Sequence, residues 1–490
     1  MPLVSKTFAD IITFARSTNA SYFNAAGVLT NAAAGEPRLD YNPSTLAAQG
    51  LLIEESRANQ IRNNTMVGAV ASVARNIGTI SSVSRSASAT VVVAATGHTV
   101  SIGDGITVSG ATPAAYNGTY AVSAVVAGVS YSYVVASSAT DSASGYAVSV
   151  MSPGTAPTNW TASPGSTLGS QIVGTGTESG ITYADIRWFG TNTSGVSQFP
   201  AIFFETGSGI AATPSQTWAE SLYVRLAAGT TTSCALSFHD YDSGVAFLRS
   251  NTISGGTVTP TAGALSTSRL SGAATTGAST AFARPLIAAT VLNGASIDIT
   301  LRIGLPQLEQ GAFATSVIPT STIALTRAAD VASVNTLSPW YNASEGTLYA
   351  EYNIPYALTT GSGPRFFALV GTGGPSVDEM PLFTNQVAGK AASFNAFAAS
   401  VNAGRIDSTP AFVANTVTKA AAGYAANNRA VTANGAAPTT SSTVYTVPTI
   451  TIARLGSQDS FGNNALNGWL RRLTYYPRKL SDAELQTLTT

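Results

Sequence analysis

Charged residues are scarce in this sequence, and the two signs cancel. They make up 10% of the 490 residues, with 24 Lys and Arg against 24 Asp and Glu. A chain without net charge creates no long-range field that would draw it to DNA or to an anionic membrane surface. We therefore expect no nucleic-acid partner.

Cysteine and long apolar runs are also nearly absent. Cys234 is the single cysteine, so an intramolecular disulfide is excluded, and we expect it to be a small buried apolar residue in a strand. No run reaches the roughly 18 apolar residues of a membrane-spanning helix. The first residues, MPLVSKTFADIITF, lack the basic and apolar regions of a secretory signal. We expect a chain that is made and folded in the cytosol and does not insert into a membrane.

Gly, Ala, Ser and Thr dominate instead, and long helix-forming runs are scarce. This composition favours β structure with many turns. Apolar and polar residues alternate in SLYVRL (221–226), IDITLRI (297–303) and GTLYAEYNI (346–354), which is typical of half-buried antiparallel strands. The sequence thus predicts an all-β, multidomain fold with two antiparallel β-sandwich or jelly-roll domains, a small β insert module and a partly irregular N-terminal attachment segment.

The length of the chain suggests about three domains, and shifts in charge density and pattern refine this to four segments. Near the end, Ser481 and Glu484 have the spacing of a capping box, which predicts a short terminal helix. The four expected segments are an attachment or oligomerisation segment (1–78), a small β insert domain (79–150), a β-sandwich (151–333) and a jelly roll ending in the helix (334–490).

The stretch GLLIEESRANQI, residues 50–61, concentrates charge in a charge-poor chain. Glu54 and Glu55 are adjacent, so on a strand they would point to opposite faces and could not act as the two facing carboxylates of a glycoside hydrolase. The stretch is either a solvated face or an attachment or oligomer interface made by Glu54, Glu55, Arg57 and Arg62. In the interface hypothesis, the two arginines pair with carboxylates such as those of Glu36, Asp40 or Glu55.

Motifs for catalysis are missing from the sequence. A Ser-His-Asp hydrolase needs a histidine base, but His98 and His239 fall in different expected segments and no Gly-x-Ser-x-Gly motif is present. Carboxylates on distant strands could still converge, although no spacing indicates it. We therefore expect a protein without enzymatic activity and without a cofactor.

The piece SFHDYDSG, residues 237–244, offers the best oxygen ligands for a metal ion. Asp240 and Asp242 are two residues apart, and carboxylates from one loop can hold calcium. The alternative is an Asp-rich turn ending at Gly244, in which the carboxylates accept hydrogen bonds from nearby amides. We favour the turn and expect no metal.

Several stretches resemble structural proteins of tailed bacteriophages. FARSTNASYFNAAGVLTNAAAGEPRLDYNP (14–43), continued by GLLIEESRANQI, looks like the N-terminal signature of their fibre and appendage proteins. LRIGLPQLEQGAFATSVIPTSTIALTRAADV (301–331) is similar to the way these proteins close a carbohydrate-binding-module-like sandwich. WLRRLTYYPRKLSDAELQTL (469–488) looks like the final strand and helix of a concanavalin A-like, laminin G-type jelly roll, and residues 84–150 resemble small β inserts of the same proteins.

The resemblance implies a non-enzymatic virion appendage, such as a tail fibre, spike or decoration protein, assembled in the cytoplasm of a host bacterium. Its partners would be tail, neck or capsid proteins, sister subunits in a homo-oligomer, commonly a trimer, and a glycan or protein of the host surface. Trp340 and Tyr341, at the entrance of the last segment, are the candidates for sugar contact, with packing as the alternative. The alternative functions are a purely structural collar, baseplate or capsid-decoration protein, and a cell-surface polysaccharide depolymerase.

Overall fold

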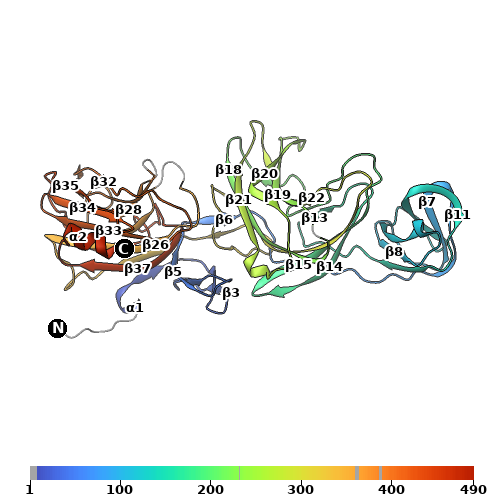
Figure 1. Ribbon diagram of the computed structural model, residues 1–490, viewed down its shortest axis with the longest axis horizontal. Helices are drawn as coiled ribbons and strands as arrows, with labels where there is room; N and C mark the ends of the chain where they lie inside the picture. The colour runs from blue at the N-terminus through green and yellow to red at the C-terminus, as the bar shows by residue number, and fades with distance from the viewer. Residues whose placement is uncertain (1–7, 231, 359–362, 386–388) are drawn as a thin grey trace. The chain divides into compact units, whose positions relative to one another are not determined.

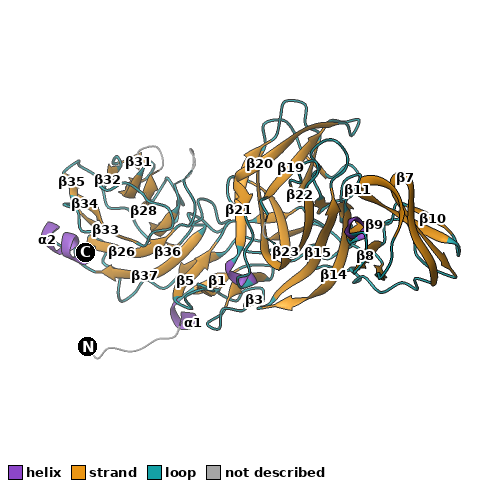
Figure 2. Cartoon of the chain, turned by 45° about the vertical axis from the view of Figure 1, so that its right-hand side comes forward, coloured by secondary structure: helices purple, strands orange, loops and turns teal. Residues whose placement is uncertain are grey.

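The structure, a computed structural model, describes residues 8–230, 232–358, 363–385 and 389–490. In this part of the chain almost all regular structure is β-strand, and the helices are short (Figures 1 and 2). The prediction of an all-β, multidomain fold is confirmed. None of the helices in these ranges is long and apolar enough to cross a lipid bilayer.

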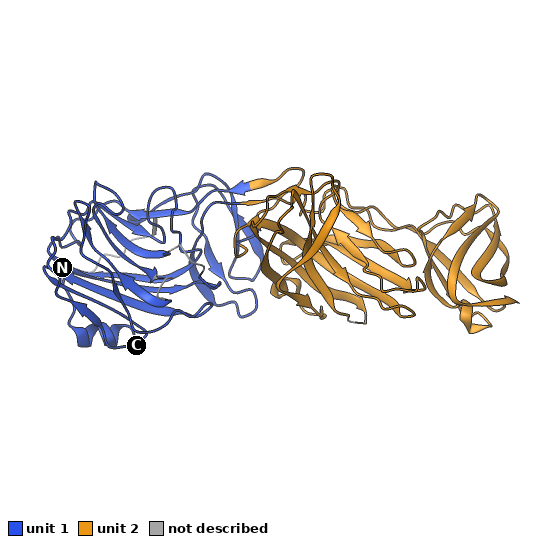
Figure 3. Ribbon diagram, turned by 90° about the horizontal axis from the view of Figure 1, so that it is seen from above, with its two compact units in different colours: residues 1–57, 315–317, 326–490 blue, residues 58–314, 318–325 orange. Residues whose placement is uncertain are grey.

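The chain folds into two compact units, which Figure 3 colours separately. Unit 2 is inserted within the sequence of unit 1, whereas the sequence predicted four consecutive segments. Two short strands, β6 (Arg57–Asn59) and β24 (Leu325–Arg327), lie where the chain passes from one unit to the other. Unit 1 consists of residues 1–57, 315–317 and 326–490, and unit 2 of residues 58–314 and 318–325.

Unit 1 contains two antiparallel sheets that share one apolar core. The first sheet has the order β1 (Thr13–Ala15), β25 (Val331–Val334), β36 (Ile452–Leu455), β27 (Arg365–Val370), β28 (Glu379–Asn385), β29 (Lys390–Phe394) and β32 (Ile406–Asp407). Strand β30 (Phe397–Ala398) also pairs with β28, and β31 (Val401–Asn402) pairs with β30. The second has the order β35 (Thr439–Ser441), β34 (Asn428–Ala433), β33 (Thr418–Ala425), β26 (Glu345–Asn353), β37 (Gly468–Tyr476), β5 (Ala48–Ile53) and β4 (Leu39–Tyr41).

The core of unit 1 follows from the alternation in GTLYAEYNI. Leu348, Ala350 and Tyr352 of β26 are fully buried on one face of the strand, as predicted. The ring of Tyr352 stacks on that of Phe366 in β27 with 3.9 Å between centroids. Its hydroxyl donates to the backbone oxygen of Ala391 at 2.5 Å. Large side chains of one sheet thus pack directly on the other.

The N-terminal residues complete the sheets of unit 1. Strand β5 pairs with β37, with Leu51 opposite Leu470, and β1 pairs with β25. Helix α1 (Phe8–Ile11) precedes β1, and the hairpin of β2 (Ala20–Phe23) and β3 (Leu29–Ala32) follows it. The chain up to Arg57 is therefore part of unit 1 and does not stand as a segment of its own.

The end of the chain forms helix α2 (Asp482–Leu488), as its capping pattern predicted. The hydroxyl of Ser481 accepts a hydrogen bond from the backbone N–H of Glu484, whose carboxylate accepts one from the N–H of Ser481. Leu485 is fully buried against Ala421 of β33 and Ala430 of β34, the strands beside which Figure 1 draws the helix.

The larger part of unit 2 is a sandwich of two antiparallel sheets around a second core. One sheet has the order β13 (Thr161–Ser163), β16 (Ala201–Phe203), β22 (Phe282–Ala289), β19 (Cys234–Tyr241) and β20 (Phe247–Val258), with β17 (Ile210–Ala211) also pairing with β22. The other has the order β14 (Gly169–Glu178), β15 (Ile181–Thr191), β23 (Ser296–Gln310), β18 (Thr217–Gly229) and β21 (Arg269–Thr275), and a 3-10 turn, η2 (Leu265–Thr267), precedes β21.

The smaller part of unit 2 is the β insert, which has its own apolar core. The insert contacts the sandwich at Gln171 of strand β14. The side-chain amide of Gln171 donates to the backbone oxygens of Met151 and Ser152, both at 3.2 Å. Its two sheets are β10 (Ala124–Val126), β11 (Ser130–Ser142) and β7 (Thr79–Thr96), and β12 (Ala147–Met151), β8 (Gly105–Ser109) and β9 (Gly118–Ala121), with the 3-10 turn η1 (Ala114–Tyr116) before β9.

Candidate functional site

Glu54, a predicted interface residue, belongs to a buried ionic cluster in unit 1 that also contains Arg16, Arg38, Arg327 and Asp330. An Nη atom of Arg38 lies 2.7 Å from the Glu54 carboxylate, and the other contacts Asp330. Arg16 lies 2.9 Å from Asp330, and Arg327 lies 3.5 Å from Glu54. The five side chains are at most 6% exposed. Glu54 is therefore not an exposed interface residue, as the interface hypothesis requires, but an interior residue that forms ion pairs within unit 1.

The environment of Glu54 sets its ionisation. Desolvation by burial would raise the pKa of Glu54, but the charges of Arg327 and Arg38 and two hydrogen bonds from Ser316 outweigh it and lower the pKa to about 2. An unfolded glutamate titrates near pH 4.3. The charged form of Glu54 therefore stabilises the folded state at neutral pH.

Acid is expected to weaken unit 1 through Glu54. As the pH falls, Glu54 takes up a proton in the unfolded chain before it does so in the folded chain. The stabilisation that the charged Glu54 gives to the folded state is therefore complete above about pH 5 and is lost between roughly pH 4.5 and 2. The urea midpoint of unit 1, followed against pH, measures the loss. A Glu54→Gln variant should be less stable than the parent at pH 7 and should lose less stability on acidification. Parallel pH profiles for the two proteins would contradict this role.

The remaining predicted interface residues form two separate ion pairs. Arg57 lies 2.5 Å from the carboxylate of Glu55, which confirms one of the expected pairs. Arg62 instead pairs with Glu205 of unit 2, donating from Nε and Nη2 at 2.8 and 2.6 Å. Its expected partners Glu36, Asp40 and Glu55 are replaced by a carboxylate 143 residues away, which the sequence pattern could not indicate.

Trp340 and Tyr341, the predicted sugar contacts, are half-buried packing residues of unit 1. The Trp340 ring meets that of Tyr475 edge-on at 5.1 Å, and the Tyr341 ring lies 5.8 Å from the same ring. The indole N–H of Trp340 donates to the backbone oxygen of Thr336 at 2.9 Å. The pair therefore takes the packing alternative, because both rings pack against the core of unit 1.

Asp242 has the contacts of a turn, and Asp240 lies just before it in strand β19. Asp242 accepts hydrogen bonds from the backbone N–H groups of Gly244 and Ala246, both at 2.9 Å. Asp240 is fully buried and accepts from the guanidinium of Arg249 at 3.0 Å. Asp242 thus makes the contacts expected of the turn, whereas Asp240 is held inside the sheet by Arg249 and by the backbone N–H of Gly277. Across the described residues, no group of three or more His, Cys, Asp or Glu side chains is placed to hold a metal ion.

The most developed surface feature of unit 2 lies beside this turn, on the sheet of β16, β19, β20 and β22. Because strand side chains alternate, residues between the core positions face away from the sandwich interior. Phe247 is 56% exposed there, while Phe203, His239 and Arg284 are half-buried. We call this group the aromatic face; its members are Phe203, His239, Tyr241, Phe247 and Arg284.

The members of the aromatic face hold one another in place. His239 meets Phe203 and Phe247 edge-on, with centroid distances of 5.3 and 5.0 Å. The guanidinium carbon of Arg284 lies 4.5 Å from the ring centroid of Phe203 and 5.5 Å from that of Tyr241. These cation–π distances restrict the arginine to one position over the sheet.

Gly209 permits this placement of Arg284. Its φ is +91°, and a Cβ at this position would come 2.3 Å from Cγ of Arg284. Any larger residue would therefore push the arginine off the rings. Glycine is required here both by its backbone conformation and by the close approach of the side chain.

His239 is uncharged at neutral pH. Burial is the main cause that lowers its pKa to about 4, and the charge of Arg284 lowers it further against a small opposing effect of Asp240. A neutral imidazole has one N–H donor and one acceptor nitrogen. The aromatic face thus combines an exposed ring, a donor–acceptor group and a fixed cation, which can bind a ligand that has both apolar and hydroxylated sides.

Sequence reasoning missed the aromatic face, although it had selected SFHDYDSG for its carboxylates. The signal in that piece is the two aromatic rings, His239 and Tyr241, at the alternate positions that share one face of a strand. Phe203 and Arg284 lie on other strands, and only the strand register places His239 opposite Arg284. None of the tryptophans belongs to this face.

No protein-family model matches the chain, and no curated protein sequence matches it either. Among solved structures, the N-terminal CBM22-1-CBM22-2 tandem domain of Paenibacillus barcinonensis Xyn10C is similar over 54% of this chain and 80% of that one, with 9% identity and a TM-score of 0.21. Domains LG4-5 of the mouse laminin alpha1 chain are similar over 60% and 88%, with 12% identity and a TM-score of 0.20.

Proposed function

We propose that this chain is a non-enzymatic virion appendage of a tailed bacteriophage and that it binds glycans of the host surface. The aromatic face is the observation that carries the binding. A sugar ring can pack its C–H side on the exposed ring of Phe247 while its hydroxyls bond to His239 and Arg284. Few polar groups placed among aromatic rings are typical of sites that orient a small ligand.

The virion part of the proposal rests on the resemblance of residues 14–61, 301–331 and 469–488 to phage appendage proteins. The same resemblance implies that the partners of the chain are other virion proteins, that the chain forms a homotrimer, and that it assembles in the cytoplasm of the host bacterium. Three copies would present three aromatic faces, so a weak single-site affinity would be raised by avidity. Immunogold labelling of virions tests the location, and light scattering on the purified chain tests the trimer.

Phe247→Ala and Arg284→Ala are each expected to weaken binding to host-surface polysaccharide by at least about tenfold. The first removes the stacking surface, and the second removes the cation that the rings hold. Biolayer interferometry on immobilised capsule or lipopolysaccharide measures the effect. Because His239 is neutral above its pKa of about 4, the affinity of the parent should be constant between about pH 5.5 and 8.

Phe461→Ala is the matched control, because Phe461 is an 80% exposed phenylalanine of unit 1 outside the aromatic face. It should bind like the parent. Equal affinities for Phe247→Ala and Phe461→Ala would remove the aromatic face as the binding site. Failure of the purified chain to block phage adsorption would favour a purely structural protein, and release of reducing ends from the polysaccharide would favour a depolymerase.

A further inference from the structure

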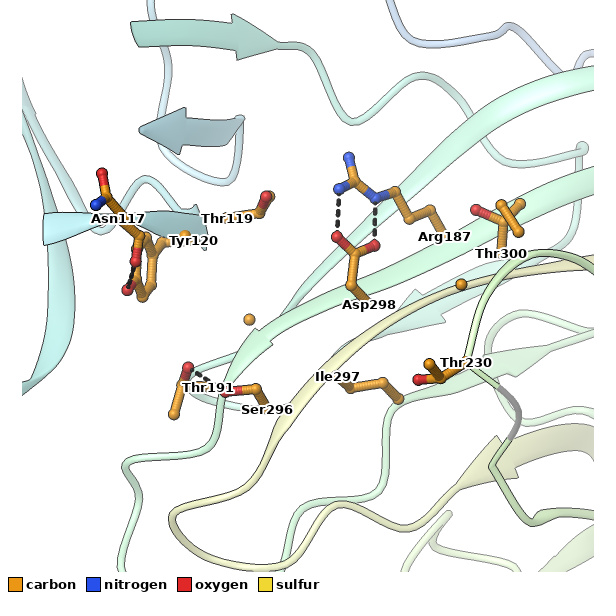
Figure 4. A pocket seen from close by; sticks show the side chains of 14 residues that line it. Asn117, Thr119, Tyr120, Arg187, Thr191, Thr230, Ser296, Ile297, Asp298 and Thr300 are labelled. Atoms are coloured by element: carbon orange, nitrogen blue, oxygen red, sulfur yellow. Dashed lines mark hydrogen bonds and ion pairs between the residues drawn. The ribbon is translucent and has the colours of Figure 1, made fainter. Parts of the chain in front are cut away.

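Unit 2 also has a groove, where strand β9 of the insert lies near the ends of β15 and β23 (Figure 4). Its volume is about 800 Å³, which is within the range of small-ligand sites. Its lining includes Thr119 and Tyr120 from the insert and Arg187, Thr191, Ser296 and Asp298 from the sandwich.

The charged lining of the groove is internally neutralised. Arg187 donates from Nε and Nη2 to the two carboxylate oxygens of Asp298 at 2.8 and 2.7 Å. Both side chains remain accessible, Arg187 at 25% and Asp298 at 52%. An anionic ligand that approached the guanidinium would meet the carboxylate beside it, and a cationic ligand would meet the guanidinium. The pair thus disfavours a charged ligand of either sign.

The uncharged lining of the groove includes several hydroxyl groups and one aromatic ring, beside small residues, Asn117 and Ile297. The hydroxyls of Thr191 and Ser296 lie 2.8 Å apart on neighbouring strands. Tyr120 stacks on Tyr133 at 4.9 Å and donates its hydroxyl to the backbone oxygen of Asn117 at 2.7 Å, so its ring is fixed in position. Hydroxyl groups both donate and accept, which matches a ligand whose own groups do the same.

We propose that this groove binds an uncharged oligosaccharide at a site separate from the aromatic face. The Arg187–Asp298 pair presents a donor and an acceptor side by side, and neighbouring hydroxyls of one sugar ring can bond to both. The hydroxyls of Thr191 and Ser296 offer further bonds, and the ring of Tyr120 offers an apolar wall for a C–H side. The site thus selects neutral sugars over sugar acids.

Calorimetric titration of the full chain with neutral gluco-, galacto- and manno-configured trisaccharides, and with trigalacturonate, tests the proposal. At least one neutral trisaccharide should bind saturably below about 10 mM, and trigalacturonate should not. Asp298→Asn leaves the charge of Arg187 uncompensated. It is therefore expected to weaken neutral binding about tenfold and to create binding of trigalacturonate.

Asp185→Asn is the matched control, because Asp185 pairs with Arg302 across the same two strands and lies outside the groove lining. It should leave both titrations unchanged. The groove proposal is overturned if no neutral trisaccharide binds, or if Asp298→Asn and Asp185→Asn have equal effects. Arg284→Ala separates the two sites. If Arg284→Ala abolishes sugar binding and Asp298→Asn does not change it, the sugar binds at the aromatic face. That result would overturn the groove proposal and leave the proposed function intact.

Discussion

Asp330→Asn is expected to lower the stability of unit 1 by about 3–5 kcal/mol. Asp330 accepts hydrogen bonds from Arg16, from Arg38 and from the backbone N–H of Glu54. When Asp330 is replaced by the uncharged Asn, only the carboxylate of Glu54 is left to balance three buried guanidinium groups. The protein interior cannot solvate the excess charge as water does, so the loss falls almost wholly on the folded state.

Differential scanning calorimetry of the full chain measures this effect. For a unit of this size, the expected loss corresponds to a fall of roughly 10 °C in the Tm of unit 1. The control is Arg405→Gln, because Arg405 is 40% exposed and its pair with Asp407 should contribute less than about 1 kcal/mol. If the stability of the Asp330→Asn protein is within about 1 kcal/mol of that of the parent, the ionic cluster contributes little stability.

Glu220→Met is expected to stabilise unit 2 by about 1–3 kcal/mol at neutral pH. Glu220 lies on β18 between the core residues Trp218 and Leu222 and is fully buried. Neither carboxyl oxygen makes a well-formed hydrogen bond to the described residues. Desolvation raises the pKa of Glu220 well above its ordinary value, and the nearby N–H of Leu286 offsets this only in part. Methionine has a similar length and no polar group to desolvate.

The pH dependence separates the charge of Glu220 from its packing. With a raised pKa the folded chain holds this proton after the unfolded chain has released it, so the parent loses stability as the pH rises above about 4.3. The Tm advantage of Glu220→Gln and Glu220→Met over the parent should therefore be larger at pH 8 than at pH 5. Asp242→Asn, at the turn, is the control for loss of a carboxylate outside the core. An advantage independent of pH would mean that Glu220 is not the titrating group.

The strands and their buried faces could be predicted because alternation is a local property. Leu348, Ala350 and Tyr352 have their predicted face, and Ser481 its predicted capping role, because neighbours a few residues away decide both. The ionic cluster could not be predicted in this way, since Glu54 and Asp330 are 276 residues apart. A charge cluster in the sequence indicates only that partners are needed, and burial or exposure depends on which distant strands supply them.

The candidate sites could not be predicted either, because their residues come together only when strands far apart in the sequence pair. The aromatic face combines residues of separate strands, and the groove combines the insert with the sandwich. The sequence makes Trp340 a candidate because large aromatic rings are common in sugar sites. The position of Tyr475, against which Trp340 packs, depends on a sheet that closes only near the end of the chain.

The insertion of unit 2 within unit 1 imposes an order on synthesis at the ribosome. Every strand of unit 2 has been translated by residue 325. Strand β5 can pair early with its neighbour β4, but its second partner, β37, is made only at residues 468–476. At translation rates of roughly 5–20 residues per second, β5 waits on the order of 20–80 s for β37. The inserted unit therefore matures first, and the pair of β4 and β5 keeps one open edge until β37 leaves the exit tunnel.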